Sequence, residues 1–361
     1  MVSEASVVVA THRFADDLDE LTGRHGFRIE SIFPADAPTT AVVSAGGVRL
    51  RLEAVSGCGT GPASLPVRIR VDGTDATAAP HAVHLPGGTV IEVHPPVTGP
   101  GFVVPDAQPT LTISHDDGAG GAPGRAGMVY RDLLPDRWGG RFVVSHISIP
   151  EGGPVGDYVH FHRLRFQVLA VQHGWVRVAY EDQGEPIVMR AGDVVLQPPG
   201  IRHRVLESSP GLSVIELACP AVHETVADWE LPLPNGVGPA DREWSGQRFV
   251  HHVAEGAPWS PADADAVGWE VRDSGIGAAT RGLGGVRFLR PVAGNGERSC
   301  TRTAAAELTM LAVMAGSVTF ECDGEATELR PASAVTIPPG TTYRLLAPSD
   351  ECELLEAALP G

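Results

Sequence analysis

The sequence is poor in basic residues and has no long hydrophobic run. Its 44 Asp and Glu outnumber its 27 Lys and Arg, which gives a formal net charge of −17. This charge repels phosphate backbones and anionic lipid, so nucleic-acid and membrane partners are not expected. No apolar stretch approaches the roughly 18 residues of a membrane-spanning helix. The first residues include an early acid and no basic segment, which predicts no signal peptide and a cytoplasmic location.

Cysteine is also scarce, and its spacing excludes two classes of site. The five cysteines are Cys58, Cys219, Cys300, Cys322 and Cys352, an odd number without any C-x-x-C pair. The pattern predicts neither a disulfide framework nor a cysteine-based zinc site. We expect the thiols to be buried, where cysteine behaves as a small hydrophobic residue.

Glycine and proline are abundant instead, at 43 and 31 residues, while 43% of the chain is hydrophobic. This composition permits a packed core and favours short strands joined by many turns over long helices. The length of 361 residues indicates two to three domains.

Residues 1–100 show strand and helix patterns in a recognisable order. Ser6–Ala10 is a β-branched run, and Asp16–His25 has acids in its first turn and leucines at helical spacing. The strands expected after this helix are Phe27–Phe33, Thr40–Ser44, Val48–Ala54, Val67–Val71 and Thr89–Val93. The order and the string GFRIESIFPADAP…AVVSAGGVRLRLE resemble a βαβββ half-module of the glyoxalase-like (vicinal oxygen chelate) superfamily. Metal-bearing members carry a His on the first strand, which Ser6–Ala10 lacks, so we expect a small, non-metallated α+β domain.

The remainder contains a linker and one unit that occurs twice. Residues 101–127 are rich in Gly and Pro and are predicted to be a linker. From residue 128 onward, four blocks recur at an offset near 140, including LAVQHGWVRV at 169–178 with LAVMAGSVTF at 311–320. A constant offset over several blocks indicates two copies of one β-unit. We place the first copy at 128–220 and the second at 271–361, joined by a connector at 221–270 in which 221–230 is the one expected helical stretch.

The first copy contains three histidines at metal-ligand spacing. His160 and His162 are two residues apart on a predicted strand, so both side chains lie on the same face. Gln167 follows on the next predicted strand, and His203 comes directly after a Pro-Pro-Gly turn. Imidazole is a ligand for Fe, Mn, Ni, Cu and Zn, so the sequence predicts a site for one divalent transition metal.

These blocks resemble the two motifs of the cupin superfamily. The family pattern is HxH, three or four residues, Glu, six residues, Gly, followed by Gly, five residues, PxG, two residues, His. The sequence matches every spacing with His160, His162, Gly174, Gly192 and His203, and it departs only where Gln167 replaces Glu. The resemblance implies two jelly-roll barrels, a mainly β bicupin preceded by the α+β domain, with His160, His162 and His203 as metal ligands. Gln167 is either a ligand through its carbonyl oxygen or a neighbour of the ligands.

The second copy lacks these ligands. Arg302, Ala304, Thr309 and Tyr343 stand where the first copy has His160, His162, Gln167 and His203. We therefore expect no metal there. Other histidines, such as His146, His173 and His223, are interpreted as structural or surface residues.

Three classes of function follow from this set of residues. Three imidazoles and an amide leave the charge of a divalent ion uncompensated, which favours a small, anionic or enolate-forming substrate. The resemblance implies an Fe(II)-type three-His dioxygenase, and no general base can be named. A redox-neutral isomerase, lyase or decarboxylase and a non-catalytic ligand-binding or sensor protein are the alternatives. Exposed sheet edges favour a homodimer.

Overall fold

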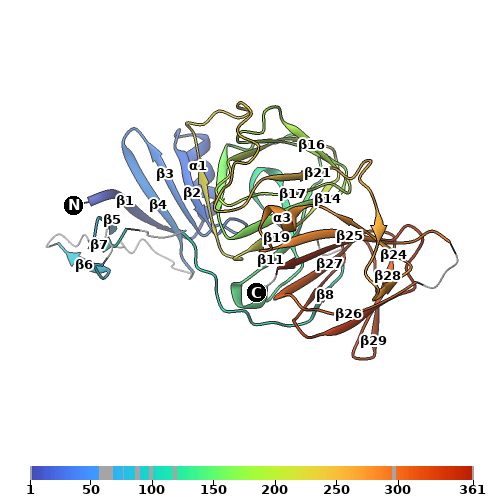
Figure 1. The fold of residues 1–361 in the computed structure, drawn as a ribbon. Coiled ribbons are helices and arrows are strands. Elements are labelled where there is room, and N and C mark those ends of the chain that lie inside the picture. The colour runs from blue at the N-terminus through green and yellow to red at the C-terminus, as the bar shows by residue number, and fades with distance from the viewer. Residues whose placement is uncertain are drawn as a thin grey trace. The chain divides into compact units, whose positions relative to one another are not determined.

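The computed structural model describes residues 2–56, 68–75, 77–85, 90–96, 101–116, 120–294 and 298–359. Cys58 and residues 117–119 of the predicted linker lie outside these ranges. The described chain is mainly β, with its strands in several mostly antiparallel sheets (Figure 1). Within the described ranges, no helix has the length and hydropathy that a membrane crossing requires.

The chain divides into two compact units. Unit 1 comprises Met1–Val103, His160–Leu164 and Val222–Leu231, and unit 2 comprises Val104–Val159, Arg165–Ala221 and Pro232–Gly361. Unit 1 therefore includes two short segments, His160–Leu164 and Val222–Leu231, that are distant in sequence from its N-terminal part. The predicted boundaries at residues 100, 127, 220 and 270 stay a prediction.

Unit 1 is built on one sheet with a single helix. Its elements are β1 (Val2–Thr11), α1 (Phe14–Gly23), β2 (Arg28–Phe33), β3 (Thr40–Ala45), β4 (Val48–Ala54), β5 (Arg68–Gly73), β6 (His81–His84), β7 (Val90–His94), β13 (His160–Arg163) and β20 (Glu224–Ala227). Within this unit the strand order is β13-β20-β2-β3-β4-β1-β5-β7-β6. Leu18 and Leu21 of α1 pack on buried Val43 and Leu52, which explains the leucine spacing of the helix. The expected strand, helix and three-strand order is present, and the glyoxalase-like interpretation stays a prediction.

The helix expected at 221–230 is wrong. Residues Glu224–Ala227 form strand β20, which pairs antiparallel with both β13 and β2. Thr225 and Val226 are β-branched and favour an extended backbone. Hydrogen bonds to β13 and β2 fix the extended conformation of this segment. Such contacts between distant segments cannot be predicted from the local sequence pattern.

Unit 2 holds the second copy of the repeat and all of the first copy except residues 160–164, which contain β13 and belong to unit 1. The strands of the first are β10 (Val129–Asp132), β11 (Val143–Ile149), β12 (Gly153–Pro154), β14 (Phe166–His173), β15 (Trp175–Tyr180), β16 (Ile187–Arg190), β17 (Val194–Leu196), β18 (His203–Ser208) and β19 (Leu212–Cys219). Preceding the first copy are β8 (Thr112–Ser114), β9 (Ala122–Pro123) and η1 (Arg125–Gly127), and α2 (Arg137–Gly140) lies within it. One sheet has the order β21-β17-β14-β19-β11-β10-β9, where β21 is Val250–His252, and β16-β15-β18 lie together in another.

The second copy repeats this arrangement. Strands β22 (Ser260–Pro261) and β23 (Ala266–Val267) lie in the connector, and β24 (Trp269–Asp273) runs from the connector into the second copy. The other elements of the second copy are α3 (Ile276–Ala279), β25 (Gly285–Pro291), β26 (Ser299–Thr303), β27 (Leu308–Ala315), β28 (Val318–Cys322), β29 (Glu325–Leu329), β30 (Ala334–Ile337), β31 (Thr342–Leu346) and β32 (Glu353–Leu359). Its sheets have the orders β22-β24-β25-β32-β27-β30-β8 and β23-β26-β31-β28-β29. The register repeats as well: Leu169 lies opposite Glu216 in the first copy, and Leu311 lies opposite Glu356 in the second.

A shared hydrophobic core joins the two copies within unit 2. Phe166 and Val168 of the first copy and Phe288 and Met310 of the second belong to one buried cluster. The other faces of the same strands enclose two further clusters, one inside each copy. Alternate residues of a strand point to opposite faces, so strands such as β14 and β27 contribute to two cores and are buried along most of their length.

The shared core predicts a large loss of stability on truncation. Phe288 is fully buried between the copies, so Phe288→Ala is expected to lower the free energy of unfolding by about 3–5 kcal/mol. Val267 is 53% exposed, and Val267→Ala should change the same quantity by less than about 0.5 kcal/mol. Urea unfolding of both variants measures the difference, and an equal effect would contradict the assignment of Phe288 to a core.

The four described cysteines are free and buried, as expected from the sequence. Burial raises the pKa of Cys219 and of Cys300 to about 11 and that of Cys352 to about 12. The thiolate is the reactive form, so these three thiols should react slowly with iodoacetamide at pH 8 in the native protein. Peptide mapping should show rapid labelling of all three only after unfolding; rapid native labelling of any one would show that it is accessible.

Candidate metal centre

Strand β13 positions two of the predicted ligands. His160 and His162 alternate with Phe161 along the strand, and both histidines are buried whereas Phe161 is partly exposed. Their ring centroids lie 5.2 Å apart. Opposite His162 on β20 is Thr225, whose Oγ1 lies 2.9 Å from His162 Nδ1. A hydrogen bond at Nδ1 fixes the ring and leaves Nε2 for another partner.

The third histidine begins strand β18. His203 follows the Pro198-Pro199-Gly200 turn, in which Gly200 has a φ of 82° that favours glycine. Its Nδ1 lies 3.1 Å from the carbonyl oxygen of Ile201. Because a carbonyl only accepts, Nδ1 of His203 is the protonated nitrogen and Nε2 bears the lone pair. This is the tautomer that binds a metal through Nε2.

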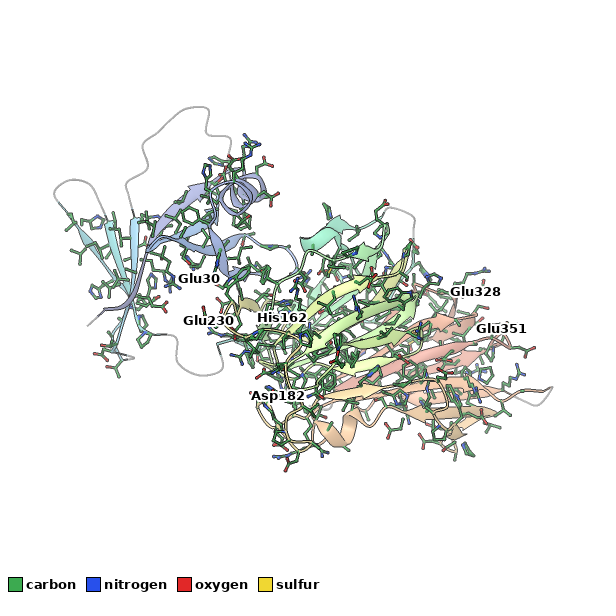
Figure 2. The ribbon with its side chains drawn as sticks, turned by 90° about the horizontal axis from the view of Figure 1, so that it is seen from above. Glu30, His162, Asp182, Glu230, Glu328 and Glu351 are labelled. Carbon is green, nitrogen blue, oxygen red and sulfur yellow. The ribbon has the colours of Figure 1, made fainter. Side chains whose placement is uncertain are left out.

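The three histidines come together as the sequence predicts. One ring nitrogen from each of His160, His162 and His203 lies within 4.8 Å of the others, and all three residues are buried. Among the described residues this is the only such group of three or more His, Cys, Asp or Glu. Figure 2 labels His162 among the side chains. Buried imidazoles with Nδ1 hydrogen-bonded at two of the rings form a donor set that fits a divalent transition ion.

Gln167 is buried within unit 2 and its amide is engaged at both ends. Its Nε2 donates to Oε1 of Glu216 at 2.6 Å, and its Oε1 accepts from Nε2 of Gln197 at 2.7 Å. Gln197 Nε2 also lies 3.2 Å from His203 Nε2. A chain of hydrogen bonds therefore connects the Glu216 carboxylate with the His203 imidazole through two amides.

Three residues that take part in these hydrogen bonds were not predicted from the sequence. Glu216 is a buried carboxylate on β19, Gln197 follows β17, and Tyr180 ends β15. The Tyr180 hydroxyl donates to Gln197 Oε1 at 3.1 Å, and burial raises the pKa of Tyr180, so it stays a donor. A charged residue within a hydrophobic strand, SVIELAC at 213–219, was the one signal in the sequence.

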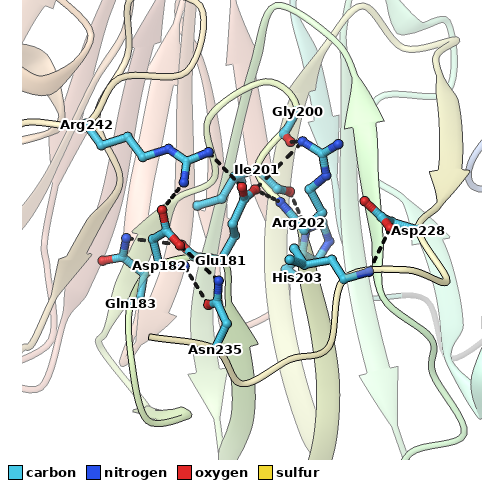
Figure 3. Close-up of polar contacts among 11 residues, drawn as sticks. Glu181, Asp182, Gln183, Gly200, Ile201, Arg202, His203, Asp228, Asn235 and Arg242 are labelled. Carbon is cyan, nitrogen blue, oxygen red and sulfur yellow. Dashed lines mark hydrogen bonds and ion pairs between the residues drawn. The ribbon is translucent and has the colours of Figure 1, made fainter. Parts of the chain in front are cut away.

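A charge network lies beside the turn that precedes His203 (Figure 3). The Glu181 carboxylate accepts from the Arg202 backbone N–H at 3.1 Å and pairs with Arg242 at 2.7 Å. Arg242 also contacts Asp182, and Asp182 accepts a hydrogen bond from Asn235. Arg202 itself lies 3.8 Å from Glu181. These contacts hold the turn before His203 against residues of the connector.

The connector reaches the interior of the first copy. Trp244 and Gln247 pair across a two-residue turn, Ser245-Gly246, in which both central residues have positive φ. Trp244 is buried in the same cluster as Tyr180 and Ile201, and the Phe249 ring lies 4.7 Å from the Tyr180 ring. The connector thus adds aromatic side chains to the interior that contains His203.

The other histidines considered in the sequence, His146, His173 and His223, differ in their burial. His173 is exposed and His146 is partly buried, and burial lowers the pKa of His146. His223 is buried, with its ring centroid 5.4 Å from that of His162 and the rings edge to face. It is therefore a neighbour of the HxH strand.

The second copy has an ion pair at the corresponding place. Arg302 lies on β26 opposite Tyr343 of β31, and its Nη1 lies 2.8 Å from Oε2 of the Glu356 carboxylate. Burial alone would lower the pKa of Arg302, but attraction to Glu356 and other neighbours outweighs it and the net pKa is raised. Ala304 and Thr309 are buried and offer no imidazole.

Comparison with solved structures finds distant matches. Ylba from E. coli is 13% identical, with 70% of this chain and 91% of that chain covered at a TM-score of 0.48. Salicylate 1,2-dioxygenase from Pseudaminobacter salicylatoxidans is 15% identical, with 71% and 86% covered at a TM-score of 0.48. A putative glyoxylate-induced protein from Pseudomonas aeruginosa is 12% identical, with 72% and 93% covered at a TM-score of 0.47.

All three TM-scores lie below 0.5 and all three identities lie at or below 15%, so fold and function are argued from the strands and the site of this chain. No family model and no curated protein matches the sequence. Closure of the sheets into barrels stays a prediction.

The hydrogen bond between Thr225 and His162 gives a first test. Thr225→Val keeps the side-chain shape and removes the partner of His162 Nδ1, so metal affinity should fall by about 10- to 100-fold. Thr342→Val, which removes an exposed Thr–Thr contact in the second copy, is the matched control and should not change it. Competition with a chromogenic chelator measures both; equal affinities for Thr225→Val and the wild type would show that Thr225 does not orient the ligand.

Proposed function

We propose that the protein is a metal-dependent bicupin enzyme acting on a small organic molecule, and that it is a three-His Fe(II)-type dioxygenase. The observation that supports this most is the buried group of His160, His162 and His203 with ring nitrogens within 4.8 Å. Hydrogen bonds at Nδ1 of His162 and His203 prepare these rings as ligands. Mn, Ni, Cu and Zn are the other ions that suit imidazole.

In this proposal the three histidines hold the metal, and the Gln167 carbonyl oxygen is a fourth donor. Once bound, the ion supplies Lewis acidity and, as Fe(II), one-electron chemistry with O₂. The ligands are all neutral, so an anionic or enolate-forming substrate is favoured at the centre. Tyr180 remains protonated and fixes Gln197 by donating to its oxygen. Trp244 and Phe249 add apolar surface to this interior.

Metal content tests the site directly. The wild-type chain, reconstituted anaerobically with Fe(II), should hold one equivalent of metal by mass spectrometry, and His160→Ala should lose most of it. His173→Ala removes an exposed histidine of the same copy and should keep the wild-type content. Metal that is absent from the wild type, or unchanged in His160→Ala, would refute the proposal.

Oxygen consumption then separates the reaction classes. The Fe(II)-loaded protein should consume O₂ stoichiometrically with product formation on at least one member of a panel of salicylate, gentisate, catechol, a β-diketone and a hydroxy acid. Turnover without O₂ would identify a redox-neutral enzyme instead. A panel member that raises the melting temperature without any turnover would identify a binding protein.

A further inference from the structure

The two copies of the repeat each bury one carboxylate at the same position of the same strand. Glu216 lies opposite Leu169 on one side and Ser145 on the other. Glu356 in turn lies opposite Leu311 and Arg287. Both carboxylates are nearly inaccessible, with residue exposures of 8% for Glu216 and 7% for Glu356. Burying a carboxylate is costly unless a cation or several donors compensate it, so its presence in both copies needs a physical reason.

In the second copy the reason is visible. Glu356 Oε2 pairs with Nη1 of Arg302 at 2.8 Å, and its Oε1 pairs with Nε of Arg287 at 2.6 Å. Two guanidinium groups therefore compensate one carboxylate inside this copy. In the first copy the corresponding positions hold His160 in place of Arg302 and Ser145 in place of Arg287. The strand that brings the cation to Glu356 is the strand that brings a proposed metal ligand in the first copy.

The hydrogen bonds of the first copy show how the charge of Glu216 reaches the metal centre. A carboxylate only accepts, so the Gln167 amide has to turn its NH₂ group toward Glu216. The carbonyl oxygen of Gln167 then faces the other way, toward Gln197 and the His203 side. An oxygen is the atom of an amide that can bind a metal ion.

We infer that Glu216 is a positioning residue of the metal centre, which fixes the Gln167 amide with its oxygen toward the histidines and supplies one of the two negative charges that compensate the ion, the other being left to an anionic substrate. This inference rests on the metal site of the proposed function. Glutamate is usual in the family at the position of Gln167; here the amide is at 167 and the carboxylate is one hydrogen bond farther out, at 216. The guanidinium of Arg302 in the second copy and the ion in the first are then equivalent partners of equivalent carboxylates.

Neutralising the carboxylate without changing its shape tests the inference. Glu216→Gln should weaken the affinity for Mn(II) or Fe(II) by about 10- to 100-fold, as expected for an outer partner of a ligand. The double variant Gln167→Glu/Glu216→Gln moves the charge to position 167 and should recover most of this loss. Chelator competition gives the affinities, and the metal-induced rise in melting temperature gives a second readout independent of activity.

Two controls remove the same charge elsewhere. Glu207→Gln neutralises an exposed carboxylate of the first copy that pairs with Arg177, and it should leave metal affinity unchanged. Glu356→Gln should also leave metal affinity unchanged but lower the melting temperature, because Arg302 and Arg287 lose their partner. If Glu216→Gln proves too unstable to purify, Gln167→Glu takes its place, and its rise in melting temperature on metal addition should exceed that of the wild type.

The outcomes separate the two proposals. Three results would overturn the role of Glu216 and leave the metal site standing. The first is wild-type metal affinity in Glu216→Gln, and the second is an equal loss of metal affinity in Glu207→Gln. Where Gln167→Glu is used, the third is a metal-induced rise in melting temperature no larger than that of the wild type. A wild-type chain that binds no transition metal would overturn both.

Discussion

A carboxylate buried inside a β-structure needs compensation, and both copies of the repeat are organised around one. The energetic cost of removing such a charge from water is several kcal/mol even after relaxation. In the second copy, Arg302 and Arg287 meet this cost for Glu356 with close ion pairs. In the first copy, Glu216 accepts a hydrogen bond from Gln167. His160 occupies the strand position of Arg302, and it is a proposed metal ligand instead of a cation. In the proposed function, one framework thus serves a permanent cation in the second copy and an exchangeable metal ion in the first.

The local patterns of the sequence predicted much of the fold and most of the proposed ligand set. Alternation predicted that His160 and His162 share a face, because the pleat of a strand allows nothing else. The repeat offset predicted that Arg302 would lie where the first copy has a histidine, and its carboxylate partner occupies the corresponding strand position. Each of these features depends on residues close together in the chain or on a repeated spacing, so one sequence contains enough information to find it.

What the sequence analysis missed depends on contacts between distant segments. Thr225 lies 63 residues from His162 and reaches it only because β20 pairs with β13. The same pairing turned an expected helix into a strand. Glu216 gave a weak signal, a charge in a hydrophobic strand, but its partner Gln167 is 49 residues away and the direction of an amide cannot be read from a pattern. Trp244 lies in a connector without a motif, and only its packing in the three-dimensional structure shows that it belongs to the interior of the first copy.

The strand with the HxH pair has a neighbour whose other side is covered by the N-terminal sheet. β13 pairs with β20, and β20 pairs in turn with β2 through Ser31 and Ile32. Loss of the N-terminal hundred residues would leave β20 as an open edge with unpaired backbone groups, a template for association with other chains. The N-terminal sheet therefore has a protective role as well: β2 covers the open side of the strand beside the proposed ligands.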